Sequence, residues 1–159
     1  MMSHRPTTVN GRAVPYGAPL PELLARLRPP GPEAWAAILA IGNCASTEAF
    51  TALVELTRDP DWRYRRSALE ALLFHPLLAS AAPLFLAALA DVSPHVMHTA
   101  CNAVATLQLS QAHDAVAQLL DSRDAETRET SVRALSSVWG PSDFDRVTRA
   151  RADGSEGLA

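Results

Sequence analysis

The chain has 159 residues, of which 48% are hydrophobic and 19% charged, and its formal net charge at pH 7 is −3. This composition is typical of a folded globular domain and excludes a disordered chain. The negative balance disfavours a nucleic-acid-binding protein, because that class usually carries a strongly basic face.

The sequence shows no segment that would insert into a membrane. No apolar run approaches the roughly 18 residues that a spanning helix needs, and Met1 to Gly17 has no apolar stretch like that of a secretory signal. Two cysteines, Cys44 and Cys101, do not make a disulfide framework. We therefore expect a cytoplasmic protein with two reduced thiols.

Residues 1–19 are polar, contain three prolines and show no hydrophobic periodicity, which predicts a flexible N-terminal arm. The rest is rich in alanine and leucine, and groups of proline, glycine and aspartate divide it into short helices. The expected helices cover approximately residues 21–27, 33–41, 47–58, 60–74, 78–90, 94–107, 110–120, 124–138 and 143–150. We predict one domain over residues 20–150 and a flexible tail over residues 151–159.

Polar residues and prolines mark several of these helix starts. Ser46 or Thr47 can cap one helix and Asp124 another, because their side-chain oxygens can accept backbone N–H groups of the first turn. Pro60 and Pro94 are expected in the first turn of the helices that follow, where a missing N–H costs nothing.

An apolar stripe recurs along the chain every 31 or 32 residues, with relative spacings of 0, 4, 7 and 8. These spacings place four side chains on one face of a helix, and the middle two are small in every copy. The copies are Glu33, Ala37, Ala40 and Ile41; Tyr64, Ala68, Ala71 and Leu72; Val96, Ala100, Ala103 and Val104; and Thr127, Ser131, Ala134 and Leu135. Such a period predicts stacked helix pairs, and we expect an all-α superhelix of about four pairs.

The second copy carries a longer pattern, in which Asp59 is followed by Tyr64-Arg65, then by Ala68 and Ala71-Leu72. This pattern resembles HEAT repeats, in particular the short bacterial type that is also found in phycobilisome lyases. The third copy keeps Asp91 and Val96 but has Met97 in place of the arginine; the fourth has Asp121, Thr127-Arg128 and Ala134-Leu135; and the first lacks both the aspartate and the arginine. The resemblance covers about residues 32–138 and implies a right-handed solenoid.

The resemblance also implies that the aspartates and arginines of the pattern form a hydrogen-bonded ladder between neighbouring repeats. We carry this structural role to Asp59, Arg65, Asp91 and Arg128, since a carboxylate suits a helix N-terminus and a guanidinium can bridge it to the next turn. Met97 should then leave one rung missing.

Histidines are the first candidates for chemistry. His95 and His98 are three residues apart, a spacing that a metal site can use, but two half-exposed histidines near a helix start are the simpler interpretation. HEAT-type di-iron enzymes such as deoxyhypusine hydroxylase use His-Glu pairs, and this sequence has no His-Glu dipeptide. We predict no catalytic residue, no metal and no cofactor.

Two surface features remain as candidate binding sites. Arg58, Arg63, Arg65 and Arg66 form a basic cluster, although Asp59, Asp61 and Glu70 can pair with it along a solvated edge. The segment 77–90 is apolar almost all round, so it is either buried between repeats or presents an interface. If part of it is exposed, the candidate contact residues on the concave face are Ala81, Ala87 and Ala88, with Thr51, Glu55, Gln111 and His113 as neighbours.

These features favour a non-catalytic scaffold or adaptor that binds another protein along the second helix of each pair. The alternative is a small lyase-like or accessory enzyme that acts on a protein-bound or nucleic-acid substrate. A deep pocket in which several ionisable side chains converge would favour the enzyme, and a shallow surface of mixed character would favour the adaptor.

Overall fold

A computed structural model describes residues 8–9, 12–13, 17–139, 143–145 and 147–149. The packing of the chain divides it into two compact units, a first unit of Met1–Ala81 and a second unit of Ala82–Ala159. No helix in the described part of the chain is long and apolar enough to cross a membrane. The predicted tail, residues 151–159, lies outside the described residues.

The described residues of the first unit form four α-helices after a very short hairpin. Its elements are β1 (Thr8–Val9), β2 (Arg12–Ala13), α1 (Leu20–Ala25), α2 (Pro32–Gly42), α3 (Thr47–Leu56) and α4 (Trp62–Leu72), followed by a 3-10 turn at Leu78–Ala81. The two strands are antiparallel, with Thr8 opposite Ala13. This hairpin lies within the segment for which the sequence predicts a flexible arm.

The second unit repeats the helix-pair arrangement. Its elements are α5 (Ala82–Ala88), α6 (Pro94–Leu107), a 3-10 turn at Ser110–Ala112, α7 (His113–Leu119) and α8 (Ala125–Ser137), and the described residues 143–145 and 147–149 are also helical. The expected single helix over 78–90 is instead a 3-10 turn and a short helix. Pro83 explains the break, because a proline has no N–H for a hydrogen bond and fits only the first turn of α5.

Polar side chains fix three helix starts. The Ser46 hydroxyl accepts the Ala49 N–H at 3.1 Å, and the Asp124 carboxylate accepts the Thr127 N–H at 2.7 Å, so both predicted caps are present. The hydrogen bonds from Thr127 hold the pKa of Asp124 below its ordinary value. Helix α4 begins at Trp62 with Asp61 as its cap. The prediction that Pro60 lies in the first turn of this helix is therefore wrong, because Pro60 precedes the helix.

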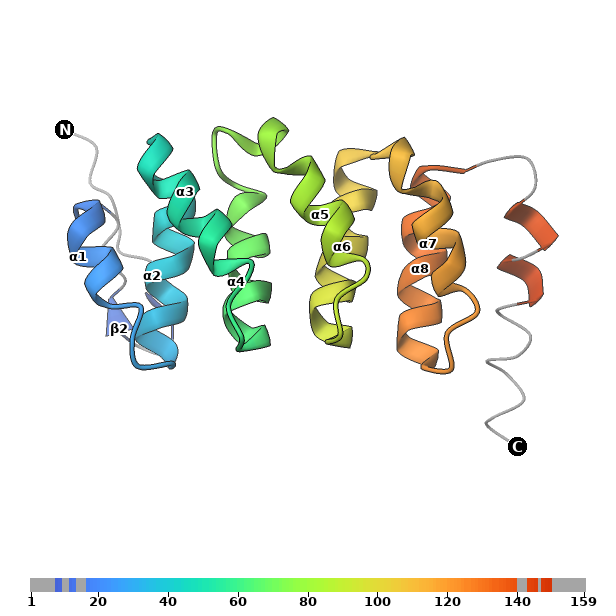
Figure 1. Ribbon diagram of the computed structural model, residues 1–159, viewed down its shortest axis with the longest axis horizontal. Coiled ribbons are helices and arrows are strands. Elements are labelled where there is room, and N and C mark those ends of the chain that lie inside the picture. The colour runs from blue at the N-terminus through green and yellow to red at the C-terminus, as the bar shows by residue number, and fades with distance from the viewer. Residues whose placement is uncertain (1–7, 10–11, 14–16, 140–142, 146, 150–159) are drawn as a thin grey trace. The chain divides into compact units, whose positions relative to one another are not determined.

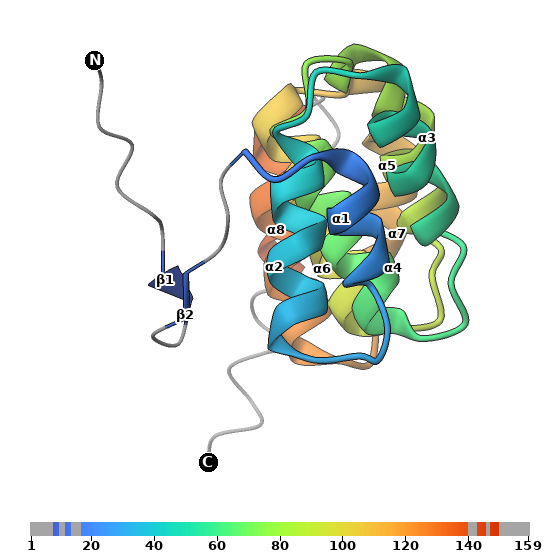
Figure 2. The same cartoon turned by 90° about the vertical axis from the view of Figure 1, so that its left-hand side faces the viewer.

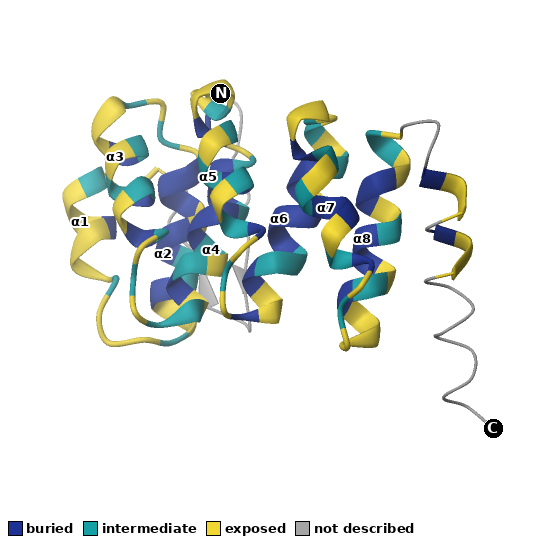
Figure 3. Cartoon of the chain, turned by 45° about the vertical axis from the view of Figure 1, so that its right-hand side comes forward, coloured by how far each residue is buried: buried dark blue, intermediate teal, exposed yellow. Residues whose placement is uncertain are grey.

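Each unit has two layers of helices. In the first unit α2 packs against α4, while α1 and α3 cover them; in the second unit α6 packs against α8, while α5 and α7 cover them (Figures 1 and 2). The recurring stripe forms the inner surface of these layers, and Figure 3 shows the buried residues gathered where the helices of a unit face one another. Every stripe residue is buried except Glu33, which is exposed.

Small residues set how closely the stacked helices approach. A Cβ atom on Gly42 would lie 2.6 Å from the carbonyl oxygen of Ala71, so only glycine fits between α2 and α4 at this point. The sequence predicts a helix end at Gly42-Asn43, and α2 does end at Gly42, where the glycine also has a role in packing.

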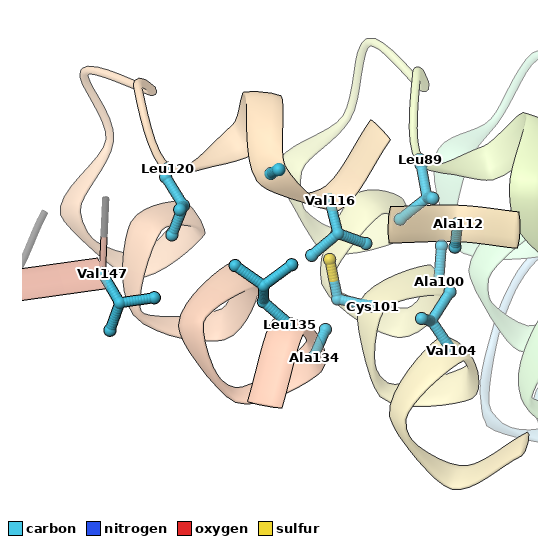
Figure 4. Close-up of a cluster of buried hydrophobic side chains, with 11 residues drawn as sticks. Leu89, Ala100, Cys101, Val104, Ala112, Val116, Leu120, Ala134, Leu135 and Val147 are labelled. Carbon is cyan, nitrogen blue, oxygen red and sulfur yellow. The ribbon is translucent and has the colours of Figure 1, made fainter. Parts of the chain in front are cut away.

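The core of the second unit is apolar and continuous from α5 to the segment after α8. Figure 4 shows Cys101 of α6, Val116 of α7 and Leu135 of α8 pointing toward one another. Burial raises the pKa of the Cys101 thiol to about 12, which makes it an inert core residue. Val147 joins the same cluster, so residues beyond α8 belong to this core.

Candidate functional site

Two arginines fold back onto the turn that precedes their own helix. The Arg65 Nη1 atom donates to the carbonyl oxygens of Asp59 and Pro60 at 2.9 and 3.0 Å. The Arg128 Nη1 atom donates to those of Ser122 and Arg123 at 2.8 and 3.1 Å. In both cases the acceptors stand six and five residues before the arginine, so the two side chains close equivalent turns and have a structural role.

A third arginine, which the sequence analysis did not single out, supports the first of these turns. The Arg28 guanidinium is ion-paired with the buried Asp59 carboxylate and lies 4.0 Å from the centre of the Tyr64 ring. The hydrogen bond to Asp59 raises the pKa of Arg28. Arg28 stands 31 residues before Asp59. That separation is one repeat period, and it is the signal that could have identified Arg28.

The turn before α6 has the same frame without an arginine. The Asp91 carboxylate accepts the Ser93 N–H at 2.8 Å, as the Asp59 carboxylate accepts the Asp61 N–H at 2.9 Å. Met97 occupies the arginine position, six residues after Asp91, and its thioether has no N–H to donate.

An open groove of about 280 Å³ lies at this turn, between the end of α5, the start of α6 and the outer side of α7. Its lining is Leu86, Leu89, Ala90, Asp91, Met97, Ala115, Gln118 and Leu119. Six of these side chains are apolar, and Asp91 is the single ionisable residue among them. The groove therefore has apolar walls with two polar groups, Asp91 and Gln118.

The sequence around the groove is unusual in its charge. Between residues 67 and 122 the chain has no arginine or lysine, although it has 14 basic residues elsewhere. The same stretch contains Asp91, Asp114 and Asp121. Asp114 lies one helical turn before Gln118, and its side chain is 95% exposed. The groove thus lies in a part of the chain whose fixed charges are all negative.

The candidate residues of the first unit lie on the surface. Thr51 and Glu55 are exposed on α3, and Arg58 is exposed beyond its end. Arg63 lies near Asp61, with 3.4 Å between Nη1 and Oδ2, and the Arg66 Nε atom donates to Glu70 at 2.8 Å. These contacts favour a solvated, paired edge over a basic binding site.

The candidates of the second unit are divided by their exposure. Ala87 and Gln111 are exposed, while Ala88 and His113 are half-buried. Ala81, the last residue of the first unit, is fully buried and cannot contact a partner. Phe85 and Leu89 are also buried, whereas Leu77 and Ala87 are exposed. The apolar segment 77–90 is therefore partly buried and partly exposed.

The candidate contact residues lie on other helices than the second helices expected from the sequence. Thr51 and Glu55 belong to α3, Ala87 and Ala88 to α5, and His113 to α7. These are the first helices of their pairs, so the predicted contact residues do not lie on the second-helix face. The groove is lined by α5 and α7, which are first helices, and by Met97 of α6.

Two histidines make contacts between helices. The Thr127 hydroxyl donates to Asp124 at 2.6 Å, so it accepts from the His98 Nε2 atom at 3.1 Å, which joins α6 to the start of α8. His113 lies between two carboxylates, Asp114 at 2.9 Å and the buried Asp143 at 2.8 Å. These hydrogen bonds, first that to Asp114 and then that to Asp143, raise the pKa of His113.

Two further histidines of the described residues, His75 and His95, show no common site. His75 is buried, and its Nδ1 atom accepts the Leu77 N–H at 3.0 Å, while His95 is exposed at the start of α6. In the part of the chain that the structure describes, no three His, Cys, Asp or Glu side chains are grouped so that they could hold a metal ion.

Solved structures of helical repeat proteins resemble this chain. An engineered protein matches with a TM-score of 0.52 and 22% identity over 87% of this chain and 71% of its own. A designed armadillo repeat protein matches with a TM-score of 0.52 and 20% identity over 84% and 71%. No protein-family model and no curated protein matches the chain. The predicted fold class, an all-α superhelix of stacked helix pairs, is confirmed.

Proposed function

We propose that this protein is a non-catalytic scaffold, built from HEAT-like repeats of the short bacterial type, that binds another protein through the first helices of its second unit. The groove between α5 and α7 is the observation on which the proposal depends. Repeat proteins generally bind macromolecules along their stacked helices, which supports this class of function. We further propose a cytoplasmic location and a single repeat domain over residues 20–150.

The chemistry of the groove supports binding over catalysis. Protein interfaces combine an apolar centre with a polar rim, and the groove has apolar walls beside Gln118. The exposed Ala87 directly follows the lining residue Leu86 on α5, so it lies next to the groove. An accessory enzyme would need ionisable side chains that converge, and Asp91 is alone in this respect.

Site-specific photocrosslinking in the native cell tests the proposal. A benzoylphenylalanine at position 87 is expected to trap one protein, which is then identified by mass spectrometry and shown to bind in purified form. The matched control is the same group at Asn102, which is exposed on α6, a second helix. Crosslinks from position 102 and none from position 87 would assign the function to the opposite face, and no protein crosslink from either would refute the proposal.

A further inference from the structure

We propose that His75 is a pH-sensitive latch for the turn between α4 and the 3-10 turn at Leu78–Ala81, where the first unit ends. The neutral imidazole closes this turn, and protonation of the imidazole opens it. The latch lies outside the groove of the second unit and is independent of the function proposed above.

The side chain of His75 holds the turn by a hydrogen bond to the backbone. Its Nδ1 atom accepts the N–H of Leu77, two residues further along the chain, at 3.0 Å. The His75 carbonyl oxygen accepts the N–H of Leu78 at 2.9 Å, so one residue binds two successive amides of the turn. Because Nδ1 is an acceptor here, the proton of the neutral ring is on Nε2.

Two other turns of the chain use the same arrangement with a carboxylate. Asp59 accepts the Asp61 N–H at 2.9 Å, and Asp91 accepts the Ser93 N–H at 2.8 Å, again two residues further along. Such a side chain imitates a backbone turn. A carboxylate remains an acceptor above about pH 5, whereas a histidine changes its charge between about pH 5 and pH 8. His75 therefore places a proton-sensitive acceptor where these two turns have an insensitive one.

The surroundings of the ring suit its neutral form. His75 is 2% exposed, and its Nε2 atom has no hydrogen-bond partner among the described residues. A second proton would have to go to Nδ1, which would then face the Leu77 N–H as a donor. The charge would also be buried, which is costly without a counter-ion. The Phe50 ring, 5.4 Å away between centres and tilted by 54°, could attract a cation but could not replace the lost hydrogen bond.

The described charges of the first unit give a protonated His75 no counter-ion. Among the described residues, none forms an ion pair with His75. Glu70, in the last turn of α4, accepts from the Arg66 Nε atom at 2.8 Å, and Glu48 and Glu55 of α3 are exposed. The remaining titratable side chains of α2, α3, α4 and the connection between α2 and α3 are Glu33, Cys44, Arg63, Tyr64 and Arg65.

Protonation therefore favours a form in which the ring leaves its site and the turn opens. Phe74 and Leu77, on either side of the buried ring, are 70% and 40% exposed, so their packing contributes little to closing the turn. The stripe from Tyr64 to Leu72 is buried without the help of the turn, and it should stay packed. Acid should thus open this end of the first unit locally.

Amide hydrogen exchange of the full-length protein, followed by NMR and corrected for the intrinsic rate at each pH, tests the latch. An exposed imidazole is half-protonated at about pH 6.5, so an opening that lets the ring take up a proton becomes about 30-fold more favourable between about pH 8 and pH 5. The protection of the Leu77 amide should fall by about that factor. The Asp61 amide, which a carboxylate holds in the same unit, is the internal control and should keep its protection.

His75→Asn is the matched variant, because its side-chain carbonyl can accept the same N–H and does not titrate. Its Leu77 amide should be equally protected at both pH values. If this variant fails to fold, proton–nitrogen correlation spectra of the wild-type imidazole give a second measurement. They should show the Nε2–H tautomer at about pH 8, and a doubly protonated ring only where the protection of Leu77 is lost.

Three results would each overturn the latch. The first is a Leu77 amide in the wild type that is as protected at about pH 5 as at about pH 8. The second is a doubly protonated His75 ring together with a protected Leu77 amide. The third is a loss of Leu77 protection in acid that the His75→Asn variant shares.

Discussion

The turns before α6 and α8 belong to the same unit and differ in the residue that stands where an arginine can reach back onto the turn. Before α8, Arg128 reaches back and its guanidinium hydrogen-bonds two carbonyl oxygens of the turn. Before α6, Met97 stands at that position, and the turn depends on the Asp91 carboxylate and on Pro94 at the start of the helix. The turn before α8 is completed by an arginine of its own repeat, whereas the turn before α6 borders a groove.

This difference separates the scaffold from the candidate site. The buried stripes of α6 and α8 are equivalent, and substitutions there should affect folding in the same way. The turns are not equivalent, and substitutions there should affect stability and binding differently. Four substitutions, from the largest expected effect to the smallest, test whether the distinction holds.

Overpacking the shared stripe should have the largest effect. Ala100 is fully buried in α6, and Ala100→Leu should lower the free energy of unfolding by about 1–3 kcal/mol, because the added atoms have no space. Chemical denaturation measures this change. Ala68→Leu at the matching position of α4 should cost a similar amount, and Asn102→Leu on the exposed side of α6 should cost little. A wild-type midpoint for both alanine variants would show that the repeat register is wrong.

Making the α8 turn resemble the α6 turn should have the next largest effect. Arg128→Met removes two hydrogen bonds from a charged donor to backbone carbonyl groups of the turn and should cost about 1–2 kcal/mol by chemical denaturation. Arg133→Met on the same helix is the control, because that arginine is exposed and lies 3.7 Å from an exposed Glu129. Equal costs for the two variants would mean that Arg128 does not hold its turn.

The reverse exchange should stabilise the protein by a smaller amount. Met97→Arg gives the α6 turn the donor that the other turns have, and we expect a gain of about 0.5–1.5 kcal/mol, the usual net value of a hydrogen bond. Thermal and chemical unfolding measure it, with Met97→Leu as the volume-matched control. A loss of stability in Met97→Arg together with no change in Met97→Leu would show that the two turns have different backbone frames.

The weakest effect should depend on pH. Since the pKa of His113 is raised in the folded protein, its protonated form stabilises the fold fully below the unfolded value of about 6.5, and this contribution disappears as the pH rises through the raised pKa. His113→Gln should therefore lower Tm most at acidic pH and least at alkaline pH. A difference in Tm between His113→Gln and the wild type that does not change with pH would contradict the assignment.

Much of the fold could be predicted because it depends on local periodicity. The stripe from Tyr64 to Leu72 follows the helical repeat, and its copies are buried at the same positions. Small middle residues such as Ala68 and Ala100 indicate from the sequence alone that the helices stack closely. The short α5 was harder to predict, since Pro83 permits either a helix start or a break.

The candidate site was less predictable because it depends on side chains from separate helices. The missing rung at Met97 was predicted from the pattern, but no periodicity indicates that Leu86 and Leu119 leave space beside it. Arg28 was missed because it precedes the region that shows the repeat pattern. The candidate contact residues lie on first helices and not on second helices for a related reason, since the sequence shows which residues share a helix face and not which helix layer a groove opens on.

The contact at Gly42 has a consequence for how this chain can vary. The spacing of α2 and α4 depends there on a hydrogen atom, because any larger substituent would lie against the Ala71 backbone. An alanine of the stripe can be replaced by a slightly larger residue if its neighbours repack. Gly42 cannot be replaced in this way, because the atoms next to it belong to the backbone and the Cβ of Ala71, which cannot move aside as a flexible side chain can. A complete mutational scan should accordingly find tolerance across the exposed side of α2 that ends abruptly at its last residue.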